Sequence, residues 1–276
     1  MGDLVALRAR LRQLERVVVA FSGGADSAFL AWDANDELAD NALAVTAVSP
    51  SLAGDEFDDC EGLAAEWKLR WRSVVTDELA NPAYVANAGD RCFHCKTELL
   101  DALDALDAVR DGATVTLGVN VDDLGDHRPG QEAAADRGAV FPLVDAGFTK
   151  ADVRAASRRL GLRTWDKPAA ACLASRLPYG TPVTVGVLDA VGRAERSLRA
   201  LGFAESRVRH YGDTARLELP LDDLPRAIGQ RDAVVAAVRS AGYRYVTLDL
   251  EGLRSGNLNA ALDDSPVRLD ARDGSA

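Results

Sequence analysis

The sequence predicts an α/β protein in which a doubly wound parallel sheet is followed by a smaller C-terminal α+β domain. Over the first 165 residues, short β-branched or apolar runs alternate with segments whose apolar residues recur at helical spacing. That alternation is typical of a parallel sheet covered by helices on both faces. After residue 185 the order changes to one helical pattern, two adjacent strand patterns, further helices and a last strand. This second order indicates a small α+β unit.

Each expected element of the first part has its own signal. Strand-like runs, apolar and often β-branched, cover residues 16–22, 41–49, 69–75, 113–120 and 139–144. Helical spacing of apolar residues covers 4–15, the segment after residue 27, 55–67, the cysteine pair to about residue 109, 131–137 and 149–162. Thr149 is the expected N-cap of the last of these helices.

The second part and the boundaries follow from composition. Proline and small residues concentrate in 164–184, which interrupts the strand–helix alternation and indicates an active-site linker loop. The expected helices of the second part are 186–201 and one or two within 221–241, and its strands are SRVRHYG, TARLELP and RYVTLDLEG. We therefore expect a nucleotide-binding domain at residues 1–165 and a linker at 166–185. An α+β domain for substrate binding or oligomerisation should follow at 186–262, and a flexible tail at 263–276.

Charge and the N-terminal sequence limit the function classes. The net charge is −11, and so acidic a surface repels a phosphate backbone, which argues against a general nucleic-acid binder. The N-terminus has no apolar run long enough for a signal peptide or a membrane span, so a cytoplasmic protein without a membrane partner is expected. Only four of the 32 basic residues are lysine, a bias that base composition of the genome can produce.

The segment SGGADS, residues 22–27, directly follows the first expected strand. In a doubly wound sheet, ligands bind at the carboxyl ends of strands. The two glycines let the backbone approach a ligand closely, and the two serines and the N-terminus of the next helix suit a phosphate. Asp26 would repel a bare phosphate but suits a Mg²⁺ ion shared with one. The segment lacks a Walker lysine, so it is not the ordinary P-loop.

The four cysteines fall into three groups. Cys92 and Cys95, in RCFHC, have a spacing that fits a disulfide, half of a zinc site or two ligands of an iron–sulfur cluster, and the expected cytoplasmic location disfavours the disulfide. Cys172 lies in PAAACLASR, where Arg176, one helical turn later, would favour the thiolate. Cys60 falls on the apolar stripe of an expected helix and is predicted to be a small buried hydrophobic residue.

The SGGADS segment resembles the PP-loop of the ATP pyrophosphatases, whose nucleotide-binding domain is of the adenine nucleotide alpha hydrolase type. The resemblance implies that ATP is bound, cleaved between its α- and β-phosphates, and used to transfer AMP to an oxygen of the substrate. A nucleophile then displaces AMP. Amide-forming synthetases and tRNA-thiolating enzymes both belong to this superfamily, so the nature of the nucleophile separates the candidate functions.

Five further motifs resemble the LarE family: RCFHCK, GVNVDDLGDHRPG, WDKPAAACLASRLPYG, AERSLRALGF and RVRHYGDTARLEL. The resemblance runs from SGGADS to about residue 220. It implies an ATP- and Mg²⁺-dependent sulfur transferase that adenylates the carboxylates of pyridinium-3,5-biscarboxylic acid mononucleotide and converts them to thiocarboxylates, in the synthesis of the nickel-pincer nucleotide of lactate racemase. In one branch the enzyme's own cysteine donates the sulfur. In the other, three cysteines hold a 4Fe–4S cluster whose fourth iron can carry an exogenous sulfide.

The resemblance assigns roles by position in this sequence. ATP phosphates and Mg²⁺ fall to Ser22, Gly23, Gly24, Asp26 and Ser27, and the surroundings of the nucleotide or reacting group to Asp126 and Arg128. The implied cluster ligands are Cys92, Cys95 and Cys172. The substrate's phosphate and carboxylates fall to Arg176, Arg207 and Arg209, and a divalent metal to Glu195 and Glu218. A small nucleotide substrate and a homo-oligomer are also implied, and the source of sulfide is left open.

Three other functions fit part of the pattern. A tRNA 2-thiolation enzyme also uses a PP-loop and a cysteine pair, but the net charge and the motifs of 164–220 argue against it. An amide ligase of the NAD synthetase type has no use for three positioned cysteines. A zinc-stabilised nucleotide-binding module would need a fourth ligand such as His94 or His127. On balance the sequence favours the cluster, which would spare Cys172 from being consumed.

Overall fold

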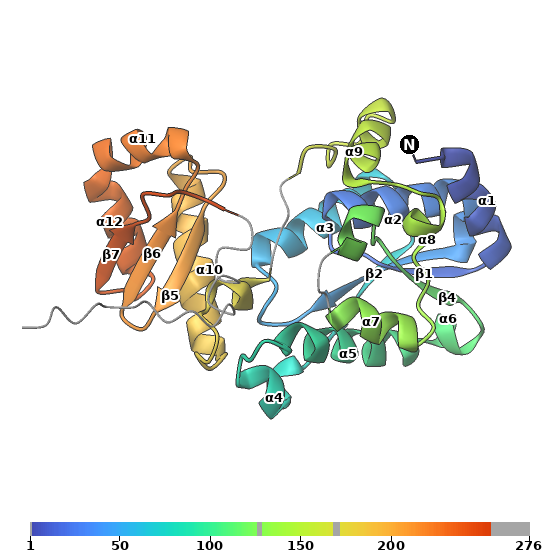
Figure 1. The fold of residues 1–276 in the computed structure, drawn as a ribbon, viewed down its shortest axis with the longest axis horizontal. Coiled ribbons are helices and arrows are strands. Elements are labelled where there is room, and N and C mark those ends of the chain that lie inside the picture. The colour runs from blue at the N-terminus through green and yellow to red at the C-terminus, as the bar shows by residue number, and fades with distance from the viewer. Residues whose placement is uncertain (1, 126–128, 168–171, 255–276) are drawn as a thin grey trace, which may run out of the picture.

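The computed structural model describes residues 2–125, 129–167 and 172–254. Its first part contains a four-stranded, all-parallel sheet in the order β3–β2–β1–β4 (Figure 1). The strands are β1 (Val17–Ala20), β2 (Ala42–Val48), β3 (Trp71–Val75) and β4 (Thr114–Leu117). Valines and alanines fill the two central strands because both faces of such a sheet are buried.

Helices cover the sheet on both faces (Figure 1). One core joins β1 and β2 to α1 (Leu4–Leu14), α2 (Ala25–Leu38), α3 (Gly54–Glu66) and α9 (Lys150–Arg159). The other core joins the opposite face to α5 (Arg91–Asp104) and α7 (Pro129–Asp136), with α6 (Asp107–Arg110) beside them. Successive valines of β1 alternate between the two cores, as the two-residue period of a strand requires. The doubly wound α/β prediction is confirmed.

Two expected elements are wrong in detail. Residues 139–144 do not form a strand: only Val140 pairs with β4, as an isolated bridge, and α8 (Pro142–Asp145) begins two residues later. Proline lacks the N–H that would continue a ladder and suits the first turn of a helix. The helix that opens at the cysteine pair also breaks, because Leu106 is extended, buries its side chain in the second core, and separates α5 from α6.

The helix after residue 149 begins as predicted. The Thr149 hydroxyl accepts a hydrogen bond from the backbone N–H of Asp152 at 3.1 Å, and the Asp152 carboxylate accepts one from the backbone N–H of Thr149 at 3.2 Å. This reciprocal capping box satisfies two backbone donors that the first turn of a helix leaves unpaired. The N-cap prediction is confirmed.

The second part is the predicted small α+β unit, with α10 (Val185–Ala200), α11 (Leu224–Gly229) and α12 (Arg231–Ser240) packed on a three-stranded sheet. The strands are β5 (Arg207–Tyr211), β6 (Thr214–Glu218) and β7 (Tyr245–Leu248). β5 and β6 form an antiparallel pair joined by a two-residue turn, and β7 pairs parallel with β6. The exact domain boundaries remain a prediction.

The loop before α10 joins the two parts. Leu173 and Val183 from this loop pack with Tyr84 of α4 (Pro82–Val85) and with Leu188 and Val191 of α10 in a small core of their own. The Arg199 guanidinium of α10 also forms an ion pair with Asp55 of α3 at 2.7 Å. Among the described residues, no helix is both long and apolar enough to cross a bilayer.

Candidate functional site

The SGGADS loop leaves the carboxyl end of β1 and enters α2. Gly23 has φ +70°, a conformation that side chains disfavour, and a Cβ on it would lie 2.9 Å from the sulfur of Cys60. Gly24 is the N-cap of α2 and offers no side chain of its own. No side chain caps the N–H groups in the first turn of this 14-residue helix, and such a helix start suits an anion.

Two serine hydroxyls shape this loop. The Ser27 hydroxyl lies 3.1 Å from that of Ser22, accepts a hydrogen bond from the Ser22 backbone N–H at 3.2 Å, and donates to the Gly24 carbonyl at 3.2 Å. Ser27 is buried in the first turn of α2. The hydroxyls predicted to contact phosphate thus also close the loop on itself.

Asp26 is held from two sides. Its carboxylate accepts a hydrogen bond from the Asn120 side-chain amide at 3.3 Å, and its other oxygen contacts the Lys150 ammonium. β4 can come this close to α2 because Gly118 has no side chain: a Cβ there would lie 2.7 Å from the backbone nitrogen of Ser27. The carboxylate is 16% exposed and faces a cation, as a Mg²⁺ ligand would.

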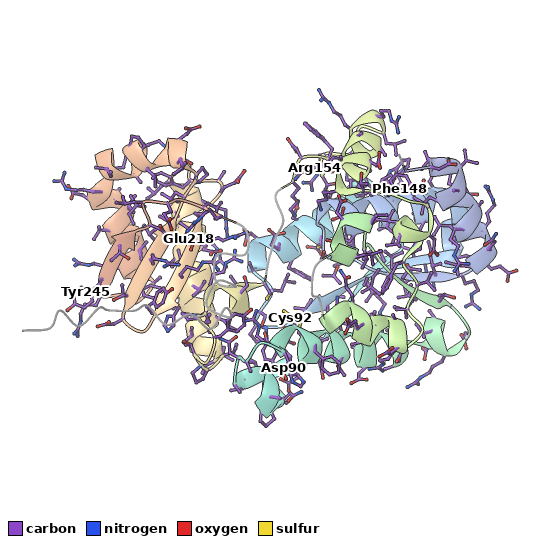
Figure 2. All side chains as sticks on the ribbon, viewed as in Figure 1. Asp90, Cys92, Phe148, Arg154, Glu218 and Tyr245 are labelled. Carbon is purple, nitrogen blue, oxygen red and sulfur yellow. The ribbon has the colours of Figure 1, made fainter. Side chains whose placement is uncertain are left out.

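Cys92 and Cys95 lie in the first turn and a half of α5, and Cys172 caps the short 3₁₀ helix Leu173–Arg176. Cys92 and Cys172 are exposed, whereas Cys95 packs against the small core beside the linker loop. Burial, then the neighbouring Cys172, raise the pKa of the Cys95 thiol to about 12. Burial opposes the charge on Arg91, but the thiols of Cys172 and Cys92 raise its pKa. Arg91 is thus close enough to Cys92 and Cys172 for their charges to act on it, and Figure 2 shows Cys92 at this end of α5.

Buried polar contacts hold the Cys172 loop against α5. The Arg91 guanidinium donates to the Asn87 side-chain oxygen at 2.6 Å and to the Ala174 carbonyl at 2.8 Å. The Asn87 amide in turn donates to the carbonyls of Pro178 and Thr181, at 2.8 and 3.0 Å. Asn87 is fully buried with a positive φ of 54°, which asparagine tolerates better than most residues. Residues 80 or more positions apart in sequence are therefore fixed beside one another.

Thiolates are the ligands that iron–sulfur clusters take, so the chemistry of Cys92, Cys95 and Cys172 suits the predicted cluster. Within 2–125, 129–167 and 172–254, no three His, Cys, Asp or Glu side chains are grouped so that they could hold one metal ion. The ring nitrogen of His94, a possible fourth zinc ligand, lies 3.3 Å from the Asp90 carboxylate. The cluster therefore stays a prediction.

Both predicted metal-binding glutamates are buried and paired with arginine. Glu195, on α10, accepts two hydrogen bonds from Arg176 at 2.8 and 3.1 Å and one from the Val208 backbone N–H at 2.9 Å. Glu218, on β6 and labelled in Figure 2, accepts from Arg209 at 2.7 Å and from Arg216 at 3.0 Å. In this arrangement the carboxylates satisfy guanidinium groups, and a metal would have to displace them.

The same arginines reach the Cys172 loop. Arg176 donates to the Cys172 carbonyl at 3.4 Å and to the Ser175 hydroxyl at 2.9 Å, and Arg209 donates to the Ser175 carbonyl at 2.7 Å. Arg176 and Arg209 are buried, at 7% and 3% exposure. These contacts connect the second sheet directly to the segment that carries Cys172.

Arg207 differs from its neighbours. It shares a face of β5 with Arg209, and in the described part of the chain no carboxylate forms an ion pair with it; its guanidinium donates to the Arg254 carbonyl at 3.1 Å. Burial, then the charges of Arg176 and Arg209, lower its pKa. Since Glu195 and Glu218 pair with Arg176 and Arg209, Arg207 is the guanidinium of this group whose charge favours an anion.

Sequence reasoning missed Asn120, Lys150 and Lys167 as parts of the loop's surroundings. Lysine usage was the available signal. In a chain with four lysines, Lys150 contacts Asp26, Lys167 lies beside Gly23, and Lys96 is next to the cysteines. Asp126 and Arg128 lie outside the described residues. Cys60 is fully buried in the first core, which confirms the prediction made for it.

Comparisons with known proteins find relatives over nearly the whole chain. A scan against protein-family models found no match. The chain is 45% identical over 263 residues to an uncharacterised protein of Synechocystis, covering 95% of this chain and 98% of the relative. It is 40% identical over 257 residues to the pyridinium-3,5-bisthiocarboxylic acid mononucleotide synthase of Lactiplantibacillus plantarum, covering 93% of each. A Methanocaldococcus jannaschii protein, also uncharacterised, is 24% identical over 258 residues, 92% of this chain and 98% of the relative.

The second of these relatives has an assigned activity, and its similarity to this chain is not confined to one motif. The similarity spans nearly the whole of both chains, so it includes the SGGADS loop, the segments that carry Cys92, Cys95 and Cys172, and the second sheet. The chain is therefore an enzyme of the LarE family of sulfur transferases, to which the L. plantarum synthase belongs.

Proposed function

We propose that the protein converts carboxylates of pyridinium-3,5-biscarboxylic acid mononucleotide to thiocarboxylates, with ATP as the activating substrate. A carboxylate oxygen attacks the α-phosphorus of ATP, the bond to the β-phosphate breaks, and pyrophosphate leaves. Sulfur then replaces the activated oxygen and AMP is released. The observation that carries the proposal is the juxtaposition of the Cys172 loop with Cys92 and Cys95, in a chain related to a synthase of the bisthiocarboxylic acid product.

The SGGADS loop and Asp26 support the activation step. Backbone N–H groups at the start of α2 would bind phosphate oxygens, and Asp26 would hold a Mg²⁺ ion that neutralises them. Asn120 orients the Asp26 carboxylate. With Mg²⁺ present, Lys150 would lose its place on Asp26 and its ammonium would be free to contact phosphate.

Arg207 is the proposed contact for the substrate's own phosphate or carboxylate. No carboxylate among the described residues forms an ion pair with it, because the nearby Glu195 and Glu218 pair with Arg176 and Arg209. Arg176 and Arg209 themselves position the Cys172 loop, since their guanidinium groups bind its backbone carbonyls. Their pairing with Glu195 and Glu218 favours this positioning role over direct binding of substrate.

Cys92, Cys95 and Cys172 would hold a 4Fe–4S cluster. When bound by three cysteines, such a cluster has one iron without a protein ligand, at which an exogenous sulfide can bind. The protein's part would be to hold the Cys172 loop against α5 through Arg91 and Asn87, with Cys92 and Cys172 both exposed. The source of the sulfide, and the homo-oligomer implied by the family, belong to the proposal as well.

Anaerobic purification followed by iron, sulfide and zinc analysis and a visible spectrum tests the cluster. We expect about four irons and four sulfides per chain. Zinc without iron would refute the cluster. Incubation with ATP and the biscarboxylic acid nucleotide tests the reaction, with AMP, pyrophosphate and thiocarboxylate as products. Intact Cys172 after repeated turnover supports cluster-borne sulfide, whereas a mass loss of hydrogen sulfide at Cys172 shows that this cysteine is the donor.

A further inference from the structure

Lys167 has no role in the proposed reaction so far, but it lies beside the SGGADS loop. Lys167 is in the segment between α9 and the Cys172 loop, and its side chain is 17% exposed. Its ammonium donates to the Glu56 carboxylate at 2.9 Å and contacts the Asp59 carboxylate, both on α3. Lysine is rare in this chain, at four of 32 basic residues, although arginine makes the same kind of ion pair elsewhere.

The position of the ammonium relates it to the SGGADS loop. A Cβ built on Gly23 would lie 3.6 Å from the Lys167 nitrogen. The ammonium therefore lies next to Gly23, in the loop whose N–H groups would bind phosphate. Any phosphate chain seated on the N–H groups around Gly23 lies within reach of a four-carbon side chain anchored at this point.

An ion pair that only held this segment to α3 would be redundant. Arg163, from the same segment, already donates to Asp59 at 2.7 Å and to Glu66 at 2.9 Å, and so fastens the segment to α3. Burial opposes the charge on Lys167, but hydrogen bonds to Asp59 and Glu56 raise its pKa, so the ammonium stays charged at neutral pH. A compact charge with rotatable donors can exchange one set of oxygens for another, whereas a bidentate guanidinium does so less readily.

We infer that Lys167 is a phosphate-binding residue that moves from Glu56 and Asp59 to the β- and γ-phosphate oxygens of the bound nucleotide. This inference rests on the proposed use of ATP. The two carboxylates hold the ammonium in place before the nucleotide binds. Once bound to it, the charge offsets the negative charge that develops on the leaving pyrophosphate. Lys167 would thereby supply, from a distant segment, a second lysine besides Lys150 to a loop that has no lysine of its own.

Isothermal titration of the full-length protein with pyrophosphate alone and with AMP alone tests this. In Lys167→Met we expect the Kd for pyrophosphate to rise about 10- to 100-fold, since one charge-assisted contact is lost. The Kd for AMP should stay within about threefold of wild type. Two matched controls, Arg163→Met, which cuts the redundant tie, and Lys68→Met, which removes an exposed lysine, should leave both values unchanged.

Each outcome decides something. An unchanged pyrophosphate Kd in Lys167→Met overturns the inference, and so does an equal loss in Arg163→Met, because the effect would then be structural. If Lys167→Met unfolds, Lys167→Gln, which keeps a donor but no charge, replaces it and should show the same selective loss. Wild-type protein that binds neither pyrophosphate nor AMP would refute the proposed use of ATP itself, and this inference with it.

Discussion

Arg91 provides the sharpest test of how the three cysteines are brought together. Its guanidinium is 6% exposed and makes hydrogen bonds of 2.6 and 2.8 Å to Asn87 and to the Ala174 carbonyl. Arg91→Met keeps the length of the side chain and removes both bonds. A hydrogen bond from a charged donor contributes about 1.5–3 kcal/mol, so the two together contribute about 3–6 kcal/mol. Methionine no longer has to bury a charge, which offsets part of this.

We therefore expect Arg91→Met to lower the free energy of unfolding by about 2–4 kcal/mol. Urea denaturation followed by circular dichroism measures this, with the slope of the transition checked for two-state behaviour. Because Ala174 is two residues from Cys172, we also expect the iron content after anaerobic purification to fall by more than half, an order-of-magnitude expectation for loss of one of three ligands.

The matched control is Arg137→Met, which removes ion pairs with Asp101 and Asp104 on the same helix, both at 2.6 Å but at the surface. Exposed pairs contribute about 0–1 kcal/mol, so this variant should keep its stability and its iron. A stability loss in Arg91→Met no larger than in the control, together with unchanged iron, would refute the claim that Arg91 fixes the Cys172 loop.

Three further predictions concern other parts of the molecule. Gly118→Ala places a Cβ against the backbone of α2 and should lower the free energy of unfolding, measured by urea denaturation, by about 1–3 kcal/mol. The control Gly186→Ala, where nothing lies within 4 Å of the new Cβ, should show no such loss, and equal losses in the two variants would contradict the packing argument. Cys172→Ser should abolish thiocarboxylate formation under either sulfur route, and product formed by this variant would rule out a role for the Cys172 thiol. The control Cys60→Ser, at a buried position, should keep the activity and lose roughly 1–3 kcal/mol of stability. Burial raises the pKa of Asp33 from 3.8 to about 6, so the folded state holds this proton more tightly than the unfolded state. The contribution of Asp33 to stability should therefore fall as the pH rises from 4 to 6. Asp33→Asn should remove that pH dependence in denaturation curves measured across the range.

Much of the site was readable from local sequence. The loop of residues 22–27 depends on neighbouring residues only: a β-branched strand, two glycines and a helix start, each with a local pattern. The helix that begins at the cysteine pair was likewise expected from the spacing of its apolar residues, and the burial of Cys60 from the apolar stripe of α3. These features were predictable because their physical causes act over a few residues.

The roles of the buried charges were not readable in that way. Glu195 and Glu218 resemble metal ligands in sequence, but each is paired with arginines that come from other elements. Arg176 and Arg209 resemble substrate contacts, yet their donors bind the backbone of the Cys172 loop. Which partner a long side chain chooses depends on distances between elements that sequence spacing does not contain.

The sequence by itself determined the fold class, the loop that suits a phosphate and the family resemblance, and it predicted the three cluster cysteines. The tertiary structure decided where these features meet. Arg91 and Asn87 bind the backbone of a segment more than 80 residues away, and Lys167 pairs with α3 and lies beside Gly23. Helix and strand signals are local, whereas such contacts depend on how helices and loops pack on the sheet, so only the folded chain shows which residues meet.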